Sequence, residues 1–78
     1  MAQIDINSIE KIDKERNIIH EKVYTTYSIF DYYGSHYIQI DTYGKVDREI
    51  PGKISQSIQL DKDTAKFLFD LIKREFNF

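Results

Sequence analysis

Apolar and polar residues change their spacing along the chain close to Glu21. Beyond that point apolar residues alternate with polar ones in the stretches KVYTTYSIF (22–30), HYIQIDTY (36–43) and KISQSIQL (53–60). A period of two, with many β-branched and aromatic residues, is typical of β-strands. Turns are expected at Tyr33-Gly34-Ser35 and at Pro51-Gly52. Three successive strands with short connections predict an antiparallel meander.

The C-terminal part of the chain has the spacing of an amphipathic helix. In residues 62–76 apolar positions recur every three or four residues, and Asp61 is placed to cap the first turn. The basic residues Lys73 and Arg74 suit the negative end of the helix dipole. One stripe of this helix is expected to pack on the strand isoleucines as the core; it consists of Ala65, Leu68, Phe69, Ile72 and Phe76.

Two other segments each allow two interpretations. Residues 7–19 form either a short helix, with Asn7 and Glu10 as a capping box, or part of a loosely attached arm over residues 1–16. Residues 44–50 form either a long hairpin loop or a short additional strand. The predicted fold class is α+β: a three- to four-stranded antiparallel meander, packed on one face by a C-terminal helix, with a short N-terminal helix or arm. Residues 1–78 are expected to form a single small domain.

Composition narrows the class of protein further. The chain has no cysteine, which excludes a cysteine nucleophile and favours a reducing cytoplasm. No window approaches the roughly 18 uncharged apolar residues of a membrane span. A net charge of −2 without blocks of like charge argues against a non-specific nucleic-acid binder and against a DNA mimic. Isoleucine far outnumbers alanine, and lysine outnumbers arginine, which suggests a bacterial or phage source with an AT-rich genome.

The face of the predicted sheet that points away from the helix has an unusual composition. Asp41 is its only charge, and its other residues are Tyr24, Thr26, Ser28, Phe30, Tyr37, Gln39, Tyr43, Ser55, Ser57 and Gln59. Tyrosine with small polar residues is typical of adaptable binding surfaces, although these residues also form and pair strands well. The site predicted here binds a protein partner through Tyr37, Tyr43 and Gln59, with Arg48 and Lys53 at the rim.

A second candidate surface lies on the helix, away from the core stripe. Phe67 and Leu71 fall there, and Phe78 follows on the same side if the helix continues. Such a patch needs a cover. The N-terminal isoleucines of the same chain could supply it, and the alternatives are a second subunit, which makes the chain a homodimer, or another partner.

No constellation of residues points to catalysis. Ser35-His36 has no triad partner, and His20 and His36 do not match a metal motif, so no catalytic residue, metal or cofactor is predicted. The sequence predicts a small non-enzymatic protein-interaction module, of the accessory or inhibitor kind. The alternative is a single-stranded nucleic-acid-binding protein, with bases stacked on the tyrosines and phosphates held by Lys45, Arg48 and Lys53.

Overall fold

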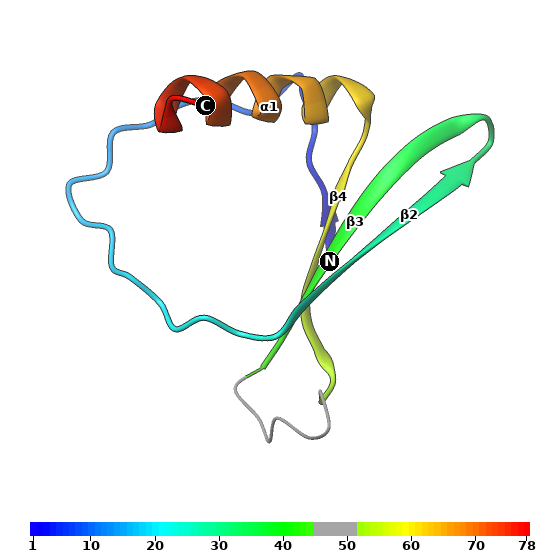
Figure 1. The fold of residues 1–78 in the computed structure, drawn as a ribbon, viewed down its shortest axis with the longest axis horizontal. Coiled ribbons are helices and arrows are strands. Elements are labelled where there is room, and N and C mark those ends of the chain that lie inside the picture. The colour runs from blue at the N-terminus through cyan, green and yellow to red at the C-terminus, as the bar shows by residue number, and fades with distance from the viewer. Residues whose placement is uncertain (45–51) are drawn as a thin grey trace.

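The computed structural model describes residues 1–44 and 52–78. It contains β1 (Ala2–Gln3), β2 (Thr25–Tyr32), β3 (Ser35–Tyr43), β4 (Ile54–Leu60) and α1 (Lys62–Phe76), which are shown in Figure 1. The prediction of a loop or strand at 44–50 lies, from residue 45 onward, outside the described residues. The chain therefore has the α+β architecture that its hydrophobic pattern predicts.

The four strands form one sheet in the order β1-β4-β3-β2. The pairs β2–β3 and β3–β4 are antiparallel, so the predicted meander is confirmed for these three strands. The order is not that of a strict meander, because β1 adds a parallel edge beside β4. The backbone N–H of Ile4 extends this edge by donating to the carbonyl of Gln59 at 3.1 Å. Residues 4–24 connect β1 to β2, which forms the opposite edge of the sheet.

The hairpin between β2 and β3 closes with a two-residue turn, where the tyrosine-glycine pair predicts one. Tyr32 and Ser35 form the last strand pair, and φ is 49° at Tyr33 and 79° at Gly34. Positive φ at both central positions is the geometry of a type I′ turn, which matches the twist of the flanking strands. Gly34 adopts it without a steric penalty. The ring of Tyr33 packs edge-on against Tyr32, with centroids 4.5 Å apart.

The pairing of β3 with β4 shifts near the start of β4. Thr42 lies opposite Gln56, but Tyr43 lies opposite Ile54, so the two strands are out of register by one residue there. The pattern of alternation predicts that Gln56 needs either a bulge or a buried partner, and the register shift provides the bulge. Gln56 is exposed. Ile54 consequently falls outside the alternation that groups it with Ile58.

Helix α1 begins and ends as its terminal residues predict. The Asp61 carboxylate accepts a hydrogen bond from the backbone N–H of Thr64 at 2.9 Å. At the other end Asn77 adopts the left-handed conformation (φ 57°), and its N–H donates to the carbonyl of Lys73. These contacts satisfy backbone groups that a helix leaves without partners at its ends.

The Asp61 cap makes the stability of α1 depend on pH. The Thr64 N–H and hydroxyl favour the carboxylate and hold the pKa of Asp61 below its ordinary value. The cap therefore contributes fully above about pH 4, the unfolded pKa, and its contribution is lost as pH falls through the lower folded pKa. In an NMR titration we expect Asp61 to titrate below an unstructured aspartate. Asp61→Asn keeps the capping acceptor and should remove this part of the acid loss of helicity; an ordinary pKa at Asp61 would contradict the cap.

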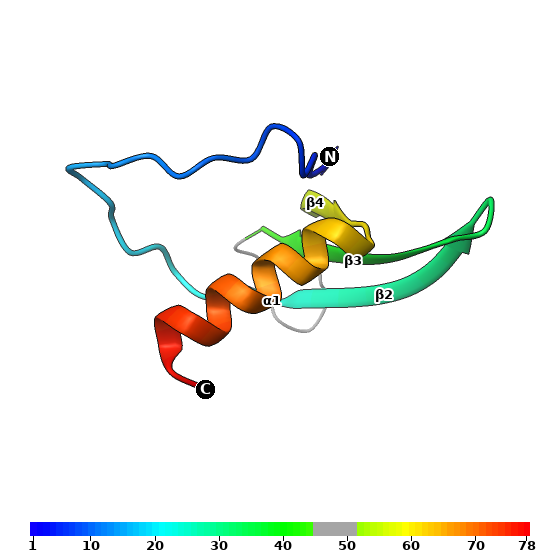
Figure 2. The same cartoon turned by 90° about the horizontal axis from the view of Figure 1, so that it is seen from above.

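The N-terminal segment forms an arm, and the predicted helix over residues 7–19 is wrong. Asp5 organises a turn instead: its side chain accepts from the N–H of Asn7 at 2.9 Å, and its carbonyl accepts from the N–H of Ser8 at 3.0 Å. A short helix with only one narrow apolar row is marginal on its own, which favours this local turn. Residues 10–22, called the arm below, make a wide loop away from the strands and then return toward the start of β2 in both views (Figures 1 and 2).

The predicted core is not closed within one chain. Among the described residues no apolar side chain is buried. On the helix stripe, Phe69 is 58% and Phe76 70% exposed, and on the sheet Tyr27 is 74% exposed. The expectation that the stripe and the strand isoleucines bury one another is therefore wrong for the single chain. The buried residues of the described chain are the polar residues Asp41, Ser57 and Thr64.

Candidate functional site

Four polar side chains form a connected network at the centre of one sheet face. The strand register places Gln39 opposite Gln59 and Asp41 opposite Ser57. The Asp41 carboxylate oxygen Oδ1 accepts from the Ser57 hydroxyl at 2.5 Å and from the Gln39 amide at 2.9 Å. The Gln59 amide donates to the Gln39 carbonyl oxygen at 2.8 Å. Each side chain of this network thus holds its neighbour in a defined orientation.

Side chains on a solvated sheet face are usually exposed, whereas the side chains at the centre of this network are buried. Asp41 is 8% and Ser57 4% exposed, whereas Gln39 and Gln59 are half-buried. A buried carboxylate is costly unless it is hydrogen-bonded, and both hydrogen bonds to Asp41 come from neutral donors. The negative charge at the centre of the face is thereby held in place by neutral groups.

Aromatic pairs lie at both ends of the polar network. Phe30 and Tyr37, which are opposite one another on β2 and β3, stack with centroids 5.4 Å apart and planes at 20°. At the other end Tyr24 and Tyr43 are 5.2 Å apart, and the Tyr43 hydroxyl lies 3.3 Å from the hydroxyl of Thr26. Paired rings of this kind lose few rotamers when they bind a partner. The rings and the network together form what we call the polar face.

The structure brings three of the five predicted site residues onto this face. Tyr37 and Tyr43 stand at its opposite ends, and Gln59 belongs to the network between them. Gln59 and Tyr37 also line a pocket of about 380 Å³, together with Phe30, Tyr32 and Gln3. Lys53 is exposed just before β4, and Arg48 lies outside the described residues.

Two contributions to the face are missed by the sequence pattern. Asp41 and Ser57 appear in it as separate polar positions, and only the strand register shows that they are opposite one another. Gln3 reaches the pocket because β1 pairs with β4 in parallel, with Gln3 opposite Gln59. A strand of two residues has no periodicity, so no signal in the sequence indicates it.

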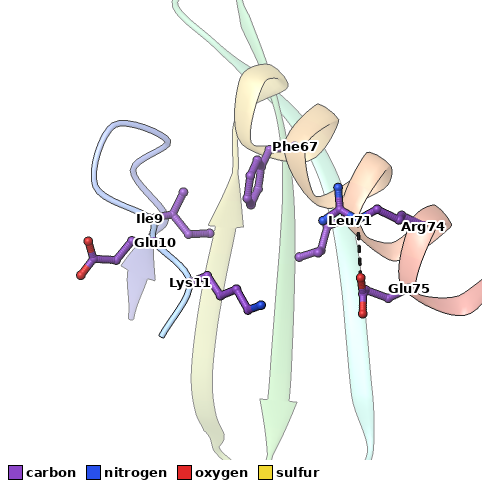
Figure 3. Close-up of a pocket in the computed structure, with 7 residues that line it drawn as sticks. All are labelled: Ile9, Glu10, Lys11, Phe67, Leu71, Arg74 and Glu75. Atoms are coloured by element: carbon purple, nitrogen blue, oxygen red, sulfur yellow. Dashed lines mark hydrogen bonds and ion pairs between the residues drawn. The ribbon is translucent and has the colours of Figure 1, made fainter. Parts of the chain in front are cut away.

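The second predicted surface lies between α1 and the start of the arm. Figure 3 shows Phe67 and Leu71 pointing from α1 toward Ile9, across a pocket of about 550 Å³. Ile9 and Leu71 are half-buried, whereas Phe67 remains 41% exposed. An N-terminal isoleucine thus faces this patch within the chain. Phe78 is not among the residues that line the pocket; its ring stacks on Phe76, with centroids 6.2 Å apart.

The two histidines of the chain lie in separate segments, one in the arm and one in the β2–β3 hairpin. His36 pairs with Asp31 across the end of the hairpin, with 2.5 Å between Nδ1 and the carboxylate, and both side chains are exposed. His20 lies in the arm and is exposed. Within residues 1–44 and 52–78, no three His, Cys, Asp or Glu side chains cluster in a way that could hold a metal ion.

Comparison with protein families, with curated proteins and with solved structures finds no match to this chain. In the part of the chain that the structure describes, no helix is both long and apolar enough to cross a membrane. What the protein does must therefore be inferred from its own residues and their arrangement.

Proposed function

We propose that this protein is a non-enzymatic protein-interaction module and that the polar face is its contact surface. The observation that carries the proposal is the hydrogen-bonded network from Asp41 to Gln59, with an aromatic pair at each end. A surface whose side chains are already ordered loses less conformational entropy on binding than a flexible one. Tyr37 and Tyr43 would supply the contact area, and Gln59 a central polar contact.

The charge of the polar face favours a protein partner over nucleic acid. Its centre holds the carboxylate of Asp41, which repels a phosphate backbone, and the whole chain carries a net charge of −2. Interfaces between proteins, in contrast, have few charges at their core and many tyrosines. The rim that we assign to Arg48 and Lys53 would add charge only at the edge of such an interface.

We also propose a cellular compartment and a biological source for the protein. A reducing cytoplasm is the compartment that a chain without cysteine favours. The composition, rich in isoleucine and lysine, favours a bacterial or phage accessory or inhibitor protein.

The proposal is tested by affinity capture from bacterial lysate, with and without nuclease treatment, with the double variant Tyr37→Ala/Tyr43→Ala beside the wild type. We expect one protein to be retained in a fixed molar ratio, and the double variant to bind it at least tenfold more weakly, because aromatic anchors dominate interface energies. Tyr33→Asn is the matched control, since asparagine suits the left-handed turn position at the hairpin tip.

Two results would contradict the polar face as the contact surface. One is full binding by a double variant whose circular dichroism and thermal unfolding match those of the wild type. The other is capture of nucleic acid that is lost at high salt or after nuclease treatment, which is the signature of phosphate contacts.

A further inference from the structure

The single chain exposes far more surface than a folded protein of its size. Its accessible surface is 7569 Å² for a mass of 9.3 kDa. A compact monomer of that mass exposes roughly 5,000 Å², so the excess is about 2,500 Å². The radius of gyration is 14.7 Å, whereas a compact chain of this length has about 11.5 Å. The chain thus folds into defined elements without closing into a globule.

The sheet, α1 and the arm all expose large apolar side chains. The strand pairs Tyr27–Ile40 and Ile29–Ile38 lie on the sheet face opposite the polar face, called the apolar face below. Ile29 is 58% exposed there. In the arm every residue from 10 to 22 is exposed, and Ile19 is 97% exposed. Large apolar side chains exposed on several elements of one chain indicate an interface.

We infer that two copies of this chain fold together as an intertwined homodimer, in which the arm of each copy lies over the apolar face and α1 of the other. Because residues 1–44 and 52–78 contain no buried apolar side chain, hydrophobic burial in one chain cannot offset the conformational entropy lost on folding. If each of two copies buries its excess, the interface totals roughly 5,000 Å², which is within the range of obligate homodimers. This inference goes beyond the proposed function and leaves the polar face free for a partner.

The charges of the arm do not oppose the association of two copies. Residues 10–16 read EKIDKER, in which three acidic and three basic residues alternate closely. Both arms of a two-fold dimer belong to one interface, so two arms with charges of a single sign would repel each other. The interspersed signs of this segment avoid that repulsion. The net charge of −2 per chain adds little repulsion between two copies.

The first test measures mass and thermal unfolding on the intact chain. Sedimentation equilibrium should give twice the monomer mass of 9.3 kDa. The midpoint of thermal unfolding should rise by several degrees over a hundredfold increase in concentration, because association stabilises the folded state by mass action. A mass of one chain with a midpoint independent of concentration overturns the inference, and so does an assembly of any other size.

The second test separates the arm from the rest of the chain. Ile19 is almost fully exposed in the single chain, so Ile19→Glu should be harmless to a monomer. In the inferred dimer this variant places a charge against the apolar face of the partner. We therefore expect the dissociation constant of the dimer to rise at least tenfold. Asn17→Glu, two residues away in the arm, is the matched control and should change the dissociation constant of the dimer less than threefold. Unchanged dissociation of Ile19→Glu would overturn the role of the arm.

These tests distinguish the dimer from the proposed function. Weaker dimerisation of Ile19→Glu tests the contact of the arm with the apolar face. Loss of partner capture by Tyr37→Ala/Tyr43→Ala tests the polar face. If the chain proves monomeric but still captures a protein through its tyrosines, the dimer fails and the interaction module stands. If it proves dimeric but captures no protein, the reverse holds.

Discussion

Replacing Asp41 with alanine should lower the free energy of unfolding by about 1–3 kcal/mol, although sequence alternation places this residue on a face away from the core. Asp41 is 8% exposed and accepts hydrogen bonds from Ser57 and Gln39. Removing the carboxylate leaves the buried Ser57 hydroxyl without its acceptor, and a buried donor without a partner bears the full cost of lost hydration. Urea denaturation at a fixed protein concentration measures the change.

The control for Asp41→Ala is Ser28→Ala, which removes an exposed hydroxyl from the same sheet face and should change stability by less than about 0.5 kcal/mol. The double variant Asp41→Ala/Ser57→Ala tests the network itself. Because each single change breaks the same hydrogen bond, the double variant should be less destabilised than the sum of the two single variants by about 0.5 kcal/mol or more. Strict additivity would show that the two side chains do not interact.

The elements that local residues determine could be predicted from the sequence. Helix α1 begins at the cap made by Asp61 and spans the predicted residues, because capping and apolar periodicity act within a few positions. The hairpin closes at Tyr33-Gly34 for the same reason. The parallel pairing of β1 with β4 depends on residues far apart in the chain, and two-residue strands carry no pattern, so it could not be predicted.

For the site, alternation placed the residues of the polar network on one face but could not predict their burial. Tyr37, Gln39 and Gln59 share the predicted face, yet their hydrogen bonds depend on a register that the shift at Tyr43 makes hard to foresee. The core was expected to close within one chain because a helix stripe and strand isoleucines are complementary. Complementary patterns do not require that the two surfaces contact each other within one chain, and apolar side chains of both surfaces are exposed in the structure.

Deleting residues 2–6 should destabilise the protein by about 2–4 kcal/mol, because this short segment attaches the arm to both the sheet and the helix. Ile4 donates its N–H to the carbonyl of Gln59, and its own carbonyl accepts from the Thr64 hydroxyl at 3.3 Å. Thr64 is fully buried in α1. The deletion removes these contacts and the pairing of β1, and it exposes β4 as a new sheet edge. Denaturant titration at a fixed concentration measures the loss.

The matched control for this deletion is Gln3→Ala, which keeps the β1 backbone and removes only an exposed side chain. It should change stability by less than about 0.5 kcal/mol. Because Ile4 joins β4 to the first turn of α1, it anchors the chain just before the Asp5 turn that leads to the arm. The deletion should therefore weaken dimer association together with stability, even though every residue of the arm is retained. A deleted chain as stable as the wild type would show that β1 only rests on the sheet edge and does not anchor the arm.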